Sequence, residues 1–114
     1  MERKLEESQD RNLEWKKRME KVKTVIAWRE RELGNEATAT IEAKLQKAGI
    51  LLEVYKYSEV KSILSKVERQ WNLMRRETRE QVIKVKQAYA DKVYLKSEKD
   101  GLRIYKEMVE LKEK

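Results

Sequence analysis

The residues that could do chemistry are concentrated in one basic stretch, residues 61–86. It contains eight Lys and Arg residues against three Glu residues. On a helix of about 3.6 residues per turn, most of these cations gather on one side of an apolar stripe. Such a face attracts phosphate groups or lipid headgroups by charge, without reading a base sequence. The residues that we assign to this candidate anion-binding surface are Arg69, Arg75, Arg76, Arg79 and Lys86.

The same basic face also has a purely structural interpretation. Its cations would then pair with Glu residues of a neighbouring helix and keep the protein in solution. Trp71 and Tyr89 do not favour base stacking, because both project into the apolar stripe rather than beside the cations. The sequence therefore leaves two interpretations of this face, an anion-binding surface and a solvated surface.

Catalytic chemistry has little support in the composition. The chain has no Cys and no His, so it lacks thiolate nucleophiles, the usual general base and the commonest transition-metal ligand. Gly34, Gly49 and Gly101 are isolated, which excludes the glycine-rich phosphate loops. The spacing of Glu77 and Glu80 is that of an ordinary solvated helix face. We expect no enzyme, no metal site, no cofactor and no small-molecule substrate.

Composition favours a helical domain that buries narrow stripes. The 114 residues are 43% charged and 39% hydrophobic, against about 25% and 45–50% in an average globular domain. We therefore expect one elongated helical domain over residues 1–114, in which each helix buries only one stripe. The net charge of +7 favours anionic partners. Many Lys, Glu and Arg beside few Asn and Gln is typical of thermostable proteins, and also fits an engineered sequence.

Targeting and membrane signals are absent from the printed sequence. The first residues are highly charged and contain no apolar core of a secretory signal. No run of about 18 apolar residues predicts a membrane span. We expect a cytoplasmic or otherwise intracellular protein.

The first predicted helix covers residues 2–33. Its 3-4 spacing is a heptad frame, which is typical of coiled coils, and Gly34 follows as a left-handed C-terminal residue. Trp28 lies nearly opposite the frame, so it is either a partner contact or a scattered apolar residue. The frame consists of Leu5, Ser8, Asn12, Trp15, Met19, Val22, Ile26, Arg29 and Leu33.

The second predicted helix covers residues 38–95 and contains the longest apolar stripe, over residues 60–89. The apolar frame of residues 41–55 is out of phase with this stripe by one residue, which predicts an irregularity near residues 49–58. The stripe consists of Val60, Ile63, Leu64, Val67, Trp71, Met74, Thr78, Val82, Val85 and Tyr89. We expect the seam between the first two helices to be formed by Trp15, Met19, Val22, Ile26, Val67, Trp71 and Met74.

The third predicted helix covers residues 98–113. Ser97 and Asp100 have capping-box spacing, and Leu102, Tyr105 and Val109 form an apolar stripe. The alternative is an α+β fold, because Asp-Gly between apolar runs is also a hairpin signal. Its small sheet would come from residues 50–57, 93–96 and 102–106.

These elements predict an elongated all-α antiparallel bundle or coiled coil of about three helices. A single chain would leave part of its apolar stripes uncovered, so we expect a protein partner or a homo-oligomer. The predicted function is a non-catalytic helical scaffold or protein–protein interaction module. The alternative is a sequence-nonspecific nucleic-acid-binding protein that uses the basic face. Binding to a membrane surface is less favoured, because the stripes are narrow.

Overall fold

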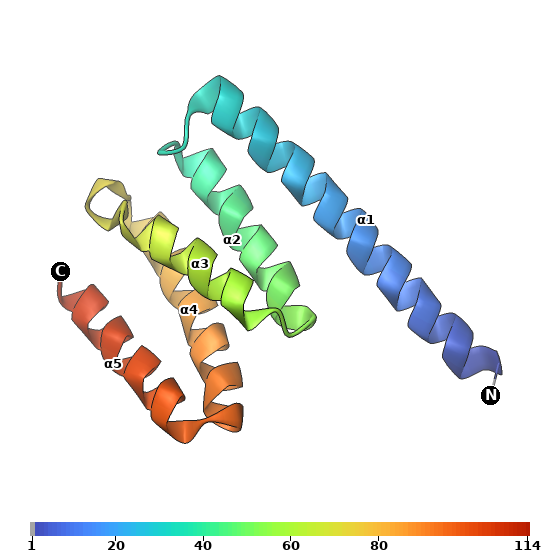
Figure 1. Cartoon of the computed structure of the whole chain (residues 1–114). Coiled ribbons are helices and arrows are strands. Elements are labelled where there is room, and N and C mark those ends of the chain that lie inside the picture. Colours follow the sequence, from blue (N-terminus) through green and yellow to red (C-terminus); the bar gives the residue numbers. More distant parts are fainter. Residues whose placement is uncertain (1) are drawn as a thin grey trace.

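The computed structural model describes the backbone of residues 2–114 and the side chains of residues 14–114. Over this range the chain is all-helical and contains no strand, which confirms the all-α class and shows the α+β alternative to be wrong there (Figure 1). Residues 2–114 form five α-helices rather than the three predicted. They are α1 (Glu2–Leu33), α2 (Thr38–Glu53), α3 (Tyr57–Glu68), α4 (Arg76–Lys96) and α5 (Glu98–Glu113).

The first two helices form an antiparallel hairpin. Gly34 has a φ of +90° and its N–H donates to the carbonyls of Arg29 and Glu30, so the predicted left-handed end of α1 is confirmed. The hydroxyl of Thr40 donates to the Gly34 carbonyl at 2.8 Å and holds the start of α2 against this turn. With 32 residues against 16, α1 runs well past the end of α2 (Figure 1). The frame positions before residue 14 lie outside the described side chains.

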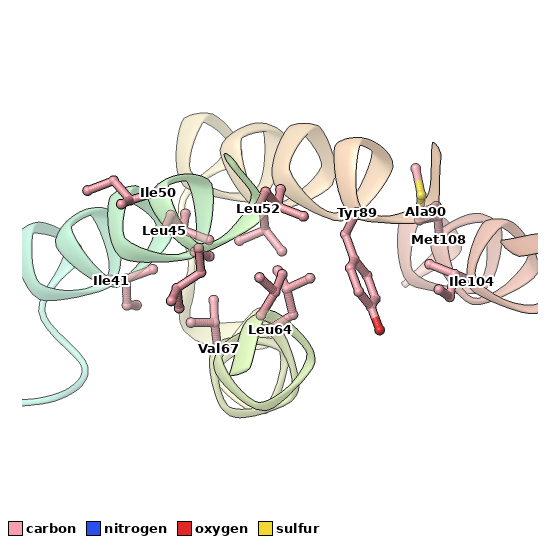
Figure 2. Packing of buried hydrophobic residues seen from close by; sticks show 14 of the residues in the cluster. Ile41, Leu45, Ile50, Leu52, Leu64, Val67, Tyr89, Ala90, Ile104 and Met108 are labelled. Atoms are coloured by element: carbon pink, nitrogen blue, oxygen red, sulfur yellow. The ribbon is translucent and has the colours of Figure 1, made fainter. Parts of the chain in front are cut away.

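Helix α2 lies at the centre of the fold, because it packs against α1, α3 and α4. Figure 2 shows Leu45 and Leu52 of α2 facing Leu64 and Val67 of α3, with Tyr89 of α4 beside them. All five side chains are buried in one continuous core. The longest apolar stripe of the sequence, over residues 60–89, lies instead on α3, the turn after it and α4.

The predicted irregularity near residues 49–58 is a helix end. Tyr55 has a φ of 63°, and its N–H donates to the Leu52 carbonyl at 3.2 Å. The next N–H, of Lys56, donates to the Leu51 carbonyl at 3.0 Å. This pair of bonds is a Schellman motif, in which Tyr55 occupies the position that glycine usually holds. The chain turns here from α2 into α3.

A second interruption, at residues 69–75, contradicts the prediction of a continuous helix over residues 60–89. A 3₁₀ turn (Trp71–Leu73) reverses the chain between α3 and α4. Trp71 and Met74 are nevertheless buried, so the stripe continues into the core across the turn. The other stripe residues are also buried or partly buried, namely Val60, Ile63, Leu64, Val67, Thr78, Val82, Val85 and Tyr89.

The last two helices form a tight hairpin at Ser97. The Ser97 Oγ accepts a hydrogen bond from the Asp100 N–H at 3.4 Å, as the capping box predicted. Gly101 packs directly against the backbone of Tyr94. Leu102 and Val109 of the predicted apolar stripe lie outside the core, since both are more than half exposed. The buried face consists of Gly101, Ile104, Met108 and Leu111.

The five helices form a flat molecule of 52 × 41 × 20 Å. The starts of α2 and α4 and the ends of α3 and α5 approach one another at the same end of this layer (Figure 1). This arrangement decides which surface side chains come together.

Candidate interaction surfaces

The predicted seam residues are all part of the hydrophobic core, but they do not form one seam between two helices. Met19 and Val22 of α1 are buried, and Trp15 and Ile26 pack against the same core. The other three predicted residues belong to α3 and to the turn that follows it. They are Val67, Trp71 and Met74. These side chains therefore stabilise the fold and are not available to a partner.

Lys86 does not belong to the anion-binding surface predicted for it. Its side chain is only 7% exposed, and its ammonium group forms ion pairs with Glu68 of α3 and, at 3.3 Å, with Glu107 of α5. A buried ammonium group needs such carboxylates, because an unpaired charge in the interior is strongly unfavourable. For Lys86, the structure supports the interpretation that a cation of the basic face pairs with Glu residues of neighbouring helices.

A groove of about 550 Å³ surrounds this ion-pair network between α3, α4 and α5. Burial raises the pKa of Tyr89 in its wall, and the negative charges of Glu107 and Asp100 add to this effect. The charged lining is balanced, with Lys61, Lys86 and Arg103 against Glu68, Asp100 and Glu107. Such a balanced network is typical of a structural contact between helices and attracts neither anions nor cations.

Carboxylates do not converge elsewhere as a metal site. Among the residues whose side chains are described, no three acidic side chains come close enough to hold a metal ion.

The tyrosine with the clearest hydrogen-bond partner is Tyr105, which donates to the Asp91 carboxylate. This bond raises the pKa of Tyr105. A neutral tyrosine held in this way positions a helix and does not act as a nucleophile or base.

The other four predicted arginines lie around the α3–α4 turn. Arg79 is half-buried, and its Nε donates to the Trp71 carbonyl at 3.0 Å while its guanidinium group lies over the indole ring. Arg76 is 3.5 Å from Glu80, and both side chains are largely exposed. Arg69 and Arg75 are exposed and form no ion pair with any residue in 14–114. The structure therefore brings these four together and separates Lys86 from them.

Two shallow grooves flank the α3–α4 turn and add cations that sequence reasoning did not assign to the surface. One groove, of about 240 Å³, is lined by Lys44 and Lys66 together with Arg69. The other, of about 580 Å³, contains Lys84 and Lys112 beside the arginines of α4. Lys44 and Lys112 come from α2 and α5, so only the fold brings them here. We call the whole set the basic surface: Lys44, Lys66, Arg69, Arg75, Arg76, Arg79, Lys84 and Lys112.

The α4–α5 hairpin carries an exposed apolar set on its outer side. Leu102 and Val109 are 53% and 57% exposed, and Tyr94 is 40% exposed. Tyr94 and Tyr105 contact each other, with ring centroids 6.2 Å apart. We call these four side chains the outer stripe, although Tyr105 is partly buried and also packs against the core. The sequence identified three of them, Leu102, Tyr105 and Val109, as an apolar stripe.

Trp28 is the other exposed aromatic residue that the sequence singled out. It is 51% exposed on α1. The structure therefore leaves it accessible, as a partner contact requires, but nothing in the structure shows a partner on it.

Comparison of the chain with protein-family models, with curated proteins and with solved structures gives no match. None of the helices within the described residues is both long enough and apolar enough to cross a membrane. Function is therefore inferred from the exposed side chains.

Proposed function

We propose that the chain is a non-catalytic helical interaction module that pairs with a second copy of itself through the outer stripe. The observation that carries this proposal is that α5 is apolar on two sides, although the core covers only one of them. A helix on the surface of a monomer needs a single apolar stripe. A second, exposed stripe is typical of an interface.

The spacing of the outer face of α5 favours a second copy as the partner. Glu98, Leu102, Tyr105, Val109 and Lys112 follow one another at intervals of four, three, four and three residues. This is a heptad frame with an acid at its first position and a base at its last. In an antiparallel two-fold pair, Glu98 of one copy lies near Lys112 of the other at both ends. The face therefore combines a heptad spacing with charges that are complementary in an antiparallel pair.

The expected dimer is weak. Stable complexes bury about 1,200–2,000 Å² in total, whereas this interface offers one four-turn helix and few apolar side chains on each copy. We therefore expect a monomer–dimer equilibrium with a Kd of roughly tens of micromolar. Sedimentation equilibrium across this concentration range measures it directly.

The apolar arm of the test compares two double variants that add the same charges. Leu102→Glu with Val109→Glu should give a monomer at all concentrations, because it places carboxylates in the middle of the interface. Leu33→Glu with Leu73→Glu changes two exposed leucines outside the hairpin and should leave dimerisation unchanged. A monomeric wild type, or equal loss in both double variants, would show the proposal to be wrong.

The charge arm tests the antiparallel orientation. Glu98→Lys should weaken the dimer, since it brings two positive charges together at each end. Adding Lys112→Glu restores opposite charges and should restore the dimer. If the double variant stays as weak as the single one, the copies do not pair in this orientation. Circular dichroism of each variant checks that α5 is still formed.

A further inference from the structure

We propose that the basic surface binds the phosphate backbone of duplex nucleic acid without base specificity. This inference does not depend on self-association, because it uses a different part of the molecule. The cations come from α2, α3, α4, α5 and the α3–α4 turn, and seven of the eight line two grooves that flank this turn. The starts of α2 and α4 and the ends of α3 and α5 approach one another in this region (Figure 1). A surface assembled from so many elements presents charge over a broad area, as a duplex backbone requires.

The positive charge of this surface is poorly neutralised. The two grooves are lined by seven Lys and Arg residues and by a single acid, Glu80. The contacts of Lys44 with Glu30 and of Arg76 with Glu80 are both 3.5 Å long and partly or fully exposed, so they contribute little. Glu77 adds one further exposed carboxylate in the first turn of α4. This excess of positive charge contrasts with the groove around Lys86, whose positive and negative side chains are equal in number.

Arg79 gives the surface a fixed anion-binding group. Its hydrogen bond to the Trp71 carbonyl and its stacking on the indole ring hold the guanidinium group in the wall of the larger groove. An arginine that is already held loses less conformational entropy when it binds phosphate. The remaining N–H groups of its planar guanidinium can donate in parallel to two oxygens of one phosphate.

The side chains of the grooves favour a duplex backbone over single strands and over a membrane. Single-strand binding relies on exposed aromatic rings, whereas Trp71, the aromatic residue of these grooves, is 5% exposed and covered by Arg79. Docking to a bilayer needs an apolar face. The α3–α4 turn exposes one large apolar side chain, Leu73.

The test is a salt titration of labelled duplex DNA by fluorescence anisotropy. If the eight cations of the basic surface all contact phosphates, the slope of log K against log salt is about −7. The triple variant Arg69→Gln, Arg75→Gln, Arg76→Gln removes three exposed arginines and leaves Arg79 in place. We expect its slope to be shallower by about 2.7 and its affinity at 0.1 M salt to fall roughly 100-fold.

The matched control removes three exposed lysines of α1, by Lys16→Gln, Lys17→Gln and Lys21→Gln, and lowers the net charge equally. It should bind almost as well as the wild type. Equal losses in both triple variants would overturn the proposal, because binding would then follow net charge alone. Absence of duplex binding by the wild type at 0.1 M salt would also overturn it. Tighter binding to phosphatidylserine vesicles than to duplex, lost in the arginine variant, would identify a lipid surface instead.

Discussion

Gly101 provides the sharpest test of how α4 and α5 pack. A Cβ atom at this position would lie 2.5 Å from both Cα and Cβ of Tyr94 and 2.9 Å from its backbone nitrogen. Carbon atoms normally pack about 3.5–4.0 Å apart, so Gly101→Ala forces the helices apart by about 1 Å. Two of the three clashing atoms are backbone atoms of α4, which cannot rotate away.

The net effect follows from two opposing terms. Overpacking costs about 1–3 kcal/mol, and a backbone clash falls at the upper end of that range. Alanine in a helix recovers about 1 kcal/mol relative to glycine. We therefore expect Gly101→Ala to lower the free energy of unfolding by about 2 kcal/mol.

Gly49→Ala is the matched control, because Gly49 also lies inside a helix and a Cβ there would meet no atom within 4 Å. It should raise the free energy of unfolding by about 0.5–1 kcal/mol. Urea unfolding followed by circular dichroism gives both values, with an unchanged m-value as the sign that only stability has changed. If Gly101→Ala is as stabilising as Gly49→Ala, the close approach to Tyr94 is refuted.

Three other perturbations have signs that the structure fixes. Lys86→Ala leaves the carboxylates of Glu68 and Glu107 without their ammonium partner. Because Glu107 is half-exposed, we expect the free energy of unfolding to fall by about 2 kcal/mol rather than by the 3–5 kcal/mol of a fully buried pair. An unchanged stability in urea would contradict this. Tyr55→Gly relieves a left-handed backbone and should stabilise by about 0.5–1 kcal/mol; a lower urea midpoint would mean that the tyrosine ring contributes more than the strain costs. The raised pKa of Tyr89 means that the folded state favours the protonated phenol. The contribution of this phenol to the free energy of unfolding is therefore complete below about pH 10 and is lost as the pH rises further. The free energy of unfolding should decline as the pH rises through this range, and the decline should be shallower in Tyr89→Phe.

Helix ends set by local signals could be predicted from the sequence. Gly34 ends α1, and Ser97 with Asp100 starts α5, because each acts on backbone groups within a few residues. The end of α2 was visible only as a phase shift in the apolar pattern. The residue in the left-handed conformation there is Tyr55, a type that carries no turn signal.

The turn at residues 69–75 could not be predicted, because it contains neither Gly nor Pro and the apolar stripe runs through it unbroken. Periodicity identifies which side chains are buried, and those of the stripe over residues 60–89 were identified correctly. It does not show that the chain reverses between Val67 and Thr78, since buried residues on two packed helices follow the same spacing as those on one. The turn is stabilised by a contact that closes it, from the Arg79 side chain to the Trp71 carbonyl eight residues earlier.

The candidate surfaces were predictable only in part, because contacts between different helices are not visible in the local sequence pattern. Local charge density identified the arginines around the turn, but the burial of Lys86 depends on carboxylates from two other helices. Lys44 and Lys112 join the basic surface only through the fold. On α5, two apolar stripes of similar spacing compete for the core. Gly101 decides between them, because only a side without a Cβ can approach Tyr94 so closely.

The central position of α2 and the peripheral position of α5 imply unequal resistance to local opening. Helix α2 packs against three helices, whereas α5 packs mainly against α4. Peripheral units of this kind separate from a native structure at a lower free energy than the units they rest on. Amide hydrogens of α5 should therefore exchange with solvent through partial unfolding, while those of α2 exchange only when the whole molecule unfolds. A second copy docked on α5 would reinforce this peripheral helix against local opening.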